Sequence, residues 1–331
     1  VPLAAATVAP GAPAWTTSWA TSQHANGPEL VRQTSRTVVH LSQGGSAVRV
    51  RLANTLGAAP LQIGSVTVGL RDQGATAVPD SLRPVTFNGS RSVSVPAGSF
   101  LVSDPVTLTT QAQQDLLVSM FIPGPATPSQ HTAGFDTSYL TPVGGGDATA
   151  APADDAFTQT TESFLVVSAV DVLSRDSRGA IVVTGGSVTD GTGSRKTGSL
   201  GAGPAAAPNS RWSDFLARRI RDELPRHAQL GVANAGIEGN TASRECGMTR
   251  SPYSNVQDRL DRDVLNLTNV KHVIVYAGTN DLGIAVGCSA EQIISAFRDI
   301  IDRSRAKGAR VYLSTITPRA VYSPPQNRER N

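Results

Sequence analysis

Three short stretches, rich in glycine, combine one serine with asparagine and acidic side chains. They read Gly-Gly-Ser-Val-Thr-Asp-Gly at 185–191, Asn-Ala-Gly-Ile-Glu-Gly-Asn at 234–240 and Gly-Thr-Asn-Asp at 278–281. A serine on a turn between a strand and a helix presents its hydroxyl outward, and the N–H groups at a helix N-terminus favour negative charge. Ser187 could therefore attack a carbonyl carbon, with an outward glycine N–H and an asparagine amide as further donors to a tetrahedral intermediate.

After residue 180, apolar runs typical of strands alternate with helical patterns. The predicted strands are residues 181–183, 229–233, 272–276 and 310–315. The helical patterns comprise Trp212, Phe215, Leu216, Ile220 and Leu224 before Pro225, then Val256, Leu260, Val264 and Leu265, then a Ser289–Gln292 capping box with Gly308 at the far end. This alternation predicts a parallel, doubly wound sheet. Because parallel strands open into loops at one edge, we expect the three polar stretches to meet there.

Residues 30–173 show a period of two instead. The alternating positions include Val48, Val50, Leu52, Val66, Val68, Val93, Val95, Val106, Leu108, Val118, Met120 and Ile122. They predict half-buried antiparallel strands in a β-sandwich, of which the jelly roll is one form. Residues 144–155 predict a long loop, and residues 174–179 a linker. We therefore expect an N-terminal β-sandwich domain over residues 1–176 and an α/β domain over residues 177–331.

Composition excludes some partners and favours a compartment. The net charge is +3 and no run of five or six Lys or Arg occurs, which argues against nucleic acid as a partner. No stretch approaches 18 apolar residues, so no membrane span is predicted, and the opening residues read as a mature N-terminus. Two cysteines, Cys246 and Cys288, in a Lys-poor, turn-rich chain predict an exported protein with one disulfide, the alternative being two buried free thiols.

With these motifs in order, residues 180–318 resemble the GDSL or SGNH hydrolase family. The matching residues are those of the three stretches at 185–191, 234–239 and 278–281. The resemblance implies a three-layer αβα fold of flavodoxin-like strand order and makes Ser187 the nucleophile. It also implies an oxyanion hole built from the N–H groups of Ser187 and Gly239 and the side chain of Asn280. The first half resembles, more loosely, β-rich domains that precede such catalytic domains in secreted bacterial esterases.

The sequence departs from the family pattern at two places. Gly186 stands where the family has an aspartate, and we expect a looser turn rather than lost chemistry. The family also carries Asp-x-x-His near its C-terminus, which supplies the general base and its orienting carboxylate, and this spacing occurs nowhere in the 331 residues. The five histidines are predicted to be surface or structural residues: His24, His40 and His131 in the β half, His227 before a strand and His272 at the start of another. An unassisted serine hydroxyl is a poor nucleophile at neutral pH.

The end of the chain offers an explanation for the missing base. A family sheet has a fifth parallel strand and a closing helix, and without them the strand at 311–315 has an open edge and an uncovered face. We therefore expect the α/β domain to lack its C-terminal segment in this chain. A segment carrying the Asp and His would then either be cleaved from the chain within an exposed polar loop and stay docked on the domain, or be left out of these 331 residues.

These observations predict a secreted serine ester hydrolase that needs no metal or organic cofactor. Its substrate would be a small-molecule or polysaccharide ester; acetylated polysaccharides, feruloyl esters, short-chain aryl esters and lysophospholipids all stay open. The alternative from another class is a catalytically inactive, esterase-like protein that binds a carbohydrate or a partner. A third reading is a structural surface protein that binds neither ester nor sugar.

Overall fold

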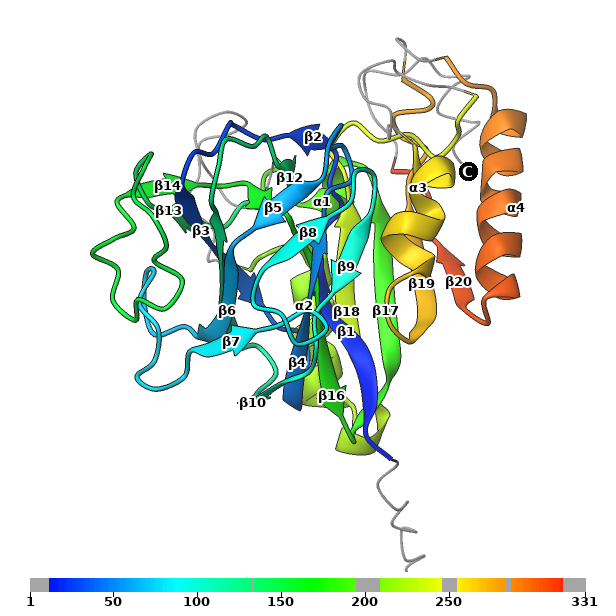
Figure 1. Cartoon of the computed structure of the whole chain (residues 1–331). Helices are drawn as coiled ribbons and strands as arrows, with labels where there is room; N and C mark the ends of the chain where they lie inside the picture. Colours follow the sequence, from blue (N-terminus) through cyan, green and yellow to red (C-terminus); the bar gives the residue numbers. More distant parts are fainter. Residues whose placement is uncertain (1–11, 133, 195–208, 246–254, 284–286, 318–331) are drawn as a thin grey trace, which may run out of the picture.

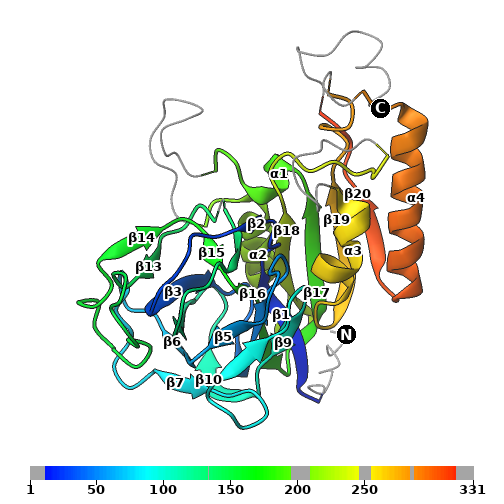
Figure 2. The ribbon, with the colours of Figure 1, turned by 45° about the horizontal axis from the view of Figure 1, so that its top comes forward.

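The computed structural model describes residues 12–132, 134–194, 209–245, 255–283 and 287–317. It consists of a β-rich N-terminal half and a C-terminal half built on a parallel sheet (Figure 1). The two halves lie side by side in both views (Figures 1 and 2). No helix among the described residues is both long and apolar enough to cross a bilayer.

Among the described residues, sixteen strands form the N-terminal half. They are β1 Ala14–Ala20, β2 Ala25–Asn26, β3 Gln33–His40, β4 Gly45–Ala53, β5 Leu61–Ile63, β6 Ser65–Leu70, β7 Arg83–Val85, β8 Val93–Val95, β9 Phe100–Val102, β10 Val106–Thr110, β11 Asp115–Ile122, β12 Ser129–His131, β13 Ser138–Leu140, β14 Gln159–Thr161, β15 Phe164–Leu165 and β16 Val167–Ser174. The two larger sheets have the orders β1-β16-β4-β10, with β9 also on β4, and β14-β13-β3-β11-β6-β7. The smaller sheets are β15-β12-β2 and β5-β8. Every pair among these strands is antiparallel, as predicted.

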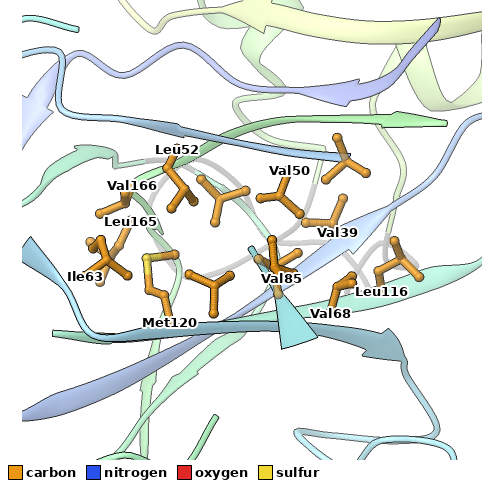
Figure 3. Close-up of a cluster of buried hydrophobic side chains, with 14 of the residues drawn as sticks. Val39, Val50, Leu52, Ile63, Val68, Val85, Leu116, Met120, Leu165 and Val166 are labelled. Atoms are coloured by element: carbon orange, nitrogen blue, oxygen red, sulfur yellow. The ribbon is translucent and has the colours of Figure 1, made fainter. Parts of the chain in front are cut away.

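Side chains from both larger sheets meet in one hydrophobic cluster (Figure 3). Val50 and Leu52 enter it from β4, and Leu116 and Met120 enter it from β11. Successive residues of a strand point to opposite faces, so the period of two in the sequence brings these apolar residues to one side. The sandwich prediction is compatible with this packing, and its jelly-roll form stays a prediction.

The prediction of half-buried strands is wrong for β3 and β11. Both strands are buried on nearly their whole length, because loops cover the face turned away from the main cluster. The Arg36 guanidinium, fully buried, donates to the carbonyl oxygens of Ala75 and Ala151 at 2.7 Å each and so ties two covering loops to β3. Val38 and Leu117 pack beneath these loops. A polar residue at an outward position therefore does not by itself indicate a solvent-facing strand.

Truncation of the shared core is expected to destabilise the protein. Leu116 is completely buried, so Leu116→Ala removes apolar contacts and leaves a cavity, at a cost of about 2–5 kcal/mol in the free energy of unfolding. The urea midpoint of the variant, followed by circular dichroism, measures the loss. The matched control is Val143→Ala, whose side chain is 67% exposed. Equal midpoints for the two variants would contradict the assigned core.

The described residues of the C-terminal half contain four parallel strands in the order β18-β17-β19-β20. Their bounds are β17 Ser177–Gly185, β18 Gln229–Gly236, β19 Val270–Tyr276 and β20 Arg310–Leu313. The α-helices are α1 Ser187–Asp190, α2 Trp212–Glu223, α3 Val256–Leu260 and α4 Ala290–Ala306, with a 3-10 turn at Arg226–Ala228 and a π-helical turn at Asp261–Leu265. Strands thus alternate with helices along this half, as predicted, and the three-layer order stays a prediction.

Helices cover both faces of this parallel sheet. Val183 of β17 packs in a cluster with Ile220 of α2, whereas the next residue back, Val182, packs with Leu260 of α3 and Ile300 of α4. The predicted apolar face of α2 includes one residue too many. Phe215 is 55% exposed and lies against the guanidinium of Arg218 instead of packing on the sheet.

Two expectations about the ends of elements are met. The Ser289–Gln292 capping box opens α4, and Gly308 adopts a left-handed φ of 78° just beyond the end of that helix. β20 lies at the edge of the sheet among the described residues, and both Tyr312 and Leu313 are more than two fifths exposed.

The predicted linker at 174–179 is not a flexible connection. β16 ends at Ser174 and β17 begins at Ser177, so only residues 175 and 176 lie between the two halves. The halves also touch directly, since the Val232 N–H donates to Ser42 Oγ at 2.8 Å. At Gly231 a Cβ would lie 2.3 Å from the carbonyl oxygen of Thr17, which is why β1 can pack so closely on β18. This contact holds the β-rich half against the parallel sheet.

Candidate active site

The ends of three neighbouring strands place the three polar stretches at one edge of the parallel sheet. Gly185, the last residue of β17, is in register with Gly236 of β18 and with Tyr276 of β19. The chain then turns at the same level of the sheet into α1, into residues 237–240 and into residues 277–281. This is the edge at which loops of a parallel sheet collect polar groups.

Ser187 and Asn280 line the same surface pocket, together with Gly186, Asn240 and Tyr276. Both side chains are half-buried, so a small molecule in the pocket could reach them. Asn280 Nδ2 donates to the carbonyl oxygen of Asn240 at 2.9 Å. Because an amide nitrogen carries two hydrogens, this bond fixes the amide and leaves a second N–H.

Two backbone N–H groups complete the set of donors near the pocket. Ser187 opens α1, and Gly239 lies in the loop that contains the Asn240 contact to Asn280. In the part of the chain that the structure describes, neither the Ser187 N–H nor the Gly239 N–H donates to a protein acceptor. Gly239 has a left-handed φ of 75° with open space where a side chain would start, so glycine serves both the turn and the approach of a ligand.

Because Gly186 has no side chain, the Asn280 amide can lie close to its backbone. Gly186 is the N-cap of α1 and makes no side-chain cap, yet its carbonyl accepts from the N–H groups of Thr189 and Asp190 at 3.0 Å each. A Cβ at this position would lie 2.9 Å from Asn280 Nδ2 and 3.3 Å from the carbonyl oxygen of Asn240. Backbone bonds thus hold the turn that was expected to be loose.

We expect Gly186→Ala to lower activity without unfolding the protein. The new Cβ must push the Asn280 amide out of its observed position, and an ångström of misplacement can cost up to two orders of magnitude in rate. The expected result is a decrease of about tenfold or more in kcat, measured with p-nitrophenyl acetate, at an unchanged melting temperature. An alanine variant as active as the parent would show that the position of the Asn280 amide has no bearing on turnover.

Asp281 and Asp190 are buried carboxylates that brace the loops around the pocket. Asp281 accepts from the N–H groups of Ala242 and Ser243 at 2.9 Å, and burial raises its pKa although these bonds oppose the shift. Asp190 Oδ2 accepts from the Glu238 N–H at 2.7 Å, immediately before Gly239. Asp190 and Asp281 therefore shape the loops, and neither lines the pocket.

Asp190 has a second partner that sequence reasoning missed. His131 Nε2 lies 2.9 Å from Asp190 Oδ1, and both side chains are almost completely buried. The other ring nitrogen of His131, Nδ1, lies 2.9 Å from the carbonyl oxygen of Ser22. His131 belongs to β12, so α1 lies beside the β2-β12-β15 sheet (Figure 2). The expectation of a structural role holds for His131, but no local signal in the sequence connects it to Asp190.

Arg259 is a fully buried arginine behind the same loops. Its guanidinium donates to Asn240 Oδ1 at 2.8 Å, to the carbonyl oxygen of Ala235 at 2.6 Å and to that of Gly185 at 3.2 Å. Burial lowers its pKa to about 10, against the opposing charge of Asp263. Arg259 thereby ties together the ends of β17 and β18.

No histidine of the sequence is hydrogen-bonded to Ser187, and all five lie in the described part of the chain. His24 contacts Thr132 Oγ1 at 3.0 Å and His40 contacts Asp115 at 2.6 Å, while His227 is exposed. His272 pairs with Ile181 in the sheet. It therefore lies about 13 Å before the end of β19, away from the pocket edge. Within the described residues, no group of three or more metal-ligating side chains is found either.

Only one cysteine of the predicted disulfide lies among the described residues. Cys288 is buried beside Leu282, Ile293 and Ile316. Its predicted partner, Cys246, lies outside the described residues. The bond therefore stays a prediction.

Comparisons with known proteins match the α/β half. Residues 183–331 match the model of the GDSL-like lipase/acylhydrolase family. A search of curated proteins found no match. Similar solved structures include the psychrotrophic esterase EstA from Pseudoalteromonas sp., with 18% identity, 47% of this chain and 67% of that chain covered and a TM-score of 0.34. Another is Est24, a carbohydrate acetylesterase from Sinorhizobium meliloti, with 16% identity, coverages of 42% and 64% and a TM-score of 0.33.

A third similar structure covers both halves. It is a family two carbohydrate esterase from Clostridium thermocellum, with 12% identity, 91% of this chain and 76% of that chain covered and a TM-score of 0.34. The chain spans about two thirds of the length of EstA and Est24. The family match over residues 183–331, which include the polar edge of the sheet, supports a hydrolase. Residues 183–331 match the GDSL-like lipase/acylhydrolase family, so the resemblance predicted from the three stretches is confirmed.

Proposed function

We propose that the protein is a serine carboxylic-ester hydrolase with Ser187 as its nucleophile. The observation that carries this proposal is the shared pocket of Ser187 and Asn280, with Gly239 in the adjoining loop. A serine hydroxyl and three convergent N–H donors are what acyl transfer through a tetrahedral intermediate requires. The substrate would be a small-molecule or polysaccharide ester.

The chemistry proceeds in two halves. Ser187 Oγ attacks the acyl carbon, its proton passes to a general base, and the carbonyl oxygen becomes an oxyanion. The N–H groups of Ser187 and Gly239 and the Asn280 amide donate to that oxyanion. Collapse of the intermediate breaks the bond to the alcohol, which leaves with the proton from the base. Water then attacks the acyl-serine in the same way, releasing the carboxylic acid and restoring Ser187.

The general base is proposed to be a histidine from a segment outside these 331 residues, held by an aspartate of the same segment. This follows from the positions of the five histidines, each of which lies elsewhere or is bonded to another group. Among the described residues β20 is an edge strand with exposed side chains, and it offers a surface for such a segment to dock. Intact mass spectrometry of the purified protein tests the proposal, which predicts a companion peptide or a longer chain. A single active species of 34.4 kDa would contradict it.

The same positions of the histidines favour a second candidate function, an inactive esterase-like binding protein. Such a protein would bind an ester or a glycan in the pocket without turnover. Hydrolysis of p-nitrophenyl acetate by the protein together with any associated segment separates the two candidates. Turnover supports the esterase, and binding of the ester without release of p-nitrophenol supports the binding protein. A panel of acetyl, feruloyl and long-chain acyl esters then identifies the acyl group.

Secretion forms part of this proposal because a disulfide between Cys246 and Cys288 requires an oxidising compartment. Thiol alkylation of the denatured protein, with and without reductant, tests the bond. The proposal expects both cysteines to react only after reduction, and alkylation of both before reduction would refute it.

A further inference from the structure

Two buried cations hold the loop of Gly239, and both are anchored on the β-rich half. His131 is linked to this loop through Asp190: His131 contacts one carboxylate oxygen, and the other oxygen accepts from the Glu238 N–H. Arg259 reaches it through Asn240, the residue after Gly239. Both cations also bind Ser22, in the segment that follows β1: His131 contacts its carbonyl oxygen and Arg259 donates to its hydroxyl at 3.2 Å.

The geometry of His131 favours a doubly protonated ring. Its two ring nitrogens face a carbonyl oxygen and a carboxylate, each at 2.9 Å, and neither of these groups can donate a proton. With Asp190 ionised, both nitrogens carry hydrogen, which makes the ring a cation. The neighbouring His24 ring lies edge-on at 4.8 Å between centroids, and burial beside His131 lowers the pKa of His24 to about 4. One charged and one neutral histidine thus sit next to the Asp190 carboxylate.

The contacts from His131 through Asp190 lead to the Gly239 N–H, a proposed donor to the oxyanion. The Glu238 N–H points at Asp190, so the carboxylate fixes the peptide plane that precedes the Gly239 N–H. An oxyanion donor contributes most when its direction is set before the reaction. Loss of the His131 cation would leave Asp190 as a buried carboxylate short of a partner, and such a group moves or takes up a proton.

We propose that the β-rich half is part of the active-site scaffold, with His131, seated on Ser22, as a positioning residue that acts through Asp190 on the Gly239 N–H. The inference rests on the proposed oxyanion role of Gly239. It assigns to the first half a function in the same reaction, beyond any binding of substrate by that half.

The arrangement implies a loss of activity on the alkaline side. The groups that face His131 are Asp190 on α1, His24 and the Ser22 carbonyl on the segment after β1, and more distantly Arg211. Burial and Arg211 favour the neutral ring, but Asp190 outweighs them and the pKa of His131 is raised. A raised histidine pKa means that the bonded state is complete below pH of about 6.5 and is lost as the pH rises through the higher value of the folded protein.

The test compares His131→Gln and His131→Ala with the parent and with His40→Gln. His40 pairs with Asp115 at 2.6 Å, so it is a histidine–aspartate pair of the same half that does not reach the loop. We expect His131→Ala to lower kcat about tenfold to a hundredfold with little change in KM. Glutamine keeps a donor for Asp190 without titrating, so His131→Gln is expected to recover part of kcat and to lose the alkaline decline. His40→Gln is expected to match the parent in both respects.

Amide hydrogen exchange supplies a readout that does not depend on turnover. We expect the peptide covering residues 234–242 to exchange faster in His131→Ala than in the parent and in His40→Gln, at a pH where all three are folded. Unchanged exchange there, or a kcat and pH profile identical to the parent, would overturn the proposal. If the parent hydrolyses no ester, the proposed function fails, and the exchange result alone decides whether His131 positions this loop.

Discussion

Ser187→Ala is expected to reduce ester hydrolysis to the background rate, a loss of roughly 10⁴-fold or more in kcat. Two other described residues that line the pocket carry hydroxyls, Thr279 and Tyr276, and both follow or belong to another strand. The Tyr276 hydroxyl contacts Thr317 Oγ1 at 2.6 Å. Alanine removes the atom that forms the acyl bond but keeps the backbone N–H and the fold of α1. Rates with p-nitrophenyl acetate, measured on the protein with any associated segment, give the loss.

A matched control for this variant lies in the same turn region. Ser194, a few residues after α1, uses its backbone N–H to contact the carbonyl oxygen of Gly191, and Ser194→Ala keeps that bond. The control is expected to retain full activity. If Ser187→Ala hydrolysed the ester as fast as Ser194→Ala, Ser187 would not be the nucleophile.

Asn280→Ala is expected to lower kcat by about 10²–10³-fold, which corresponds to about 3–4 kcal/mol of lost transition-state stabilisation. The reason is that the fixed amide donates to negative charge that develops only during the reaction. KM is expected to change little, because the uncharged ester gains less from the donor than the oxyanion does. The parameters come from the dependence of the initial rate on ester concentration.

The role of Asn280 is separable from a general effect on folding. Asn280 also holds the carbonyl oxygen of Asn240, so the melting temperature of the variant is measured alongside its rate. Asn266→Ala, at an exposed position after the π-helical turn, is the control and is expected to leave both quantities unchanged. A large increase in KM with an unchanged kcat would assign Asn280 to substrate binding and contradict an oxyanion role.

The sequence was sufficient to predict the edge of the sheet at which the polar groups collect. Each polar stretch directly follows an apolar run, and alternation with helices makes such runs parallel, so their loops must open on the same side. The registers of Gly185 with Gly236 and Tyr276 agree with that reasoning. The capping box at Ser289 was also predictable, because it depends only on residues three apart in the chain.

The buried residues that hold the polar loops in place were not predictable in this way. His131 and Asp190 are 59 residues apart and belong to different halves of the chain, so no periodicity or motif relates them. The contact exists because β1 packs on β18 and brings Ser22 behind the polar loops. The predictions of which α2 residues are buried and of a half-buried β3 were wrong for a similar reason. Both depend on which distant segments pack against these elements.

The most direct test of the central claim is to find where the acyl group goes. The protein is mixed with p-nitrophenyl acetate, quenched in acid during turnover, digested and analysed by tandem mass spectrometry. We predict one acetyl group on Ser187, present in the parent and in Ser194→Ala and absent from Ser187→Ala. An acetyl group on another residue, or continued hydrolysis by Ser187→Ala, would contradict the account.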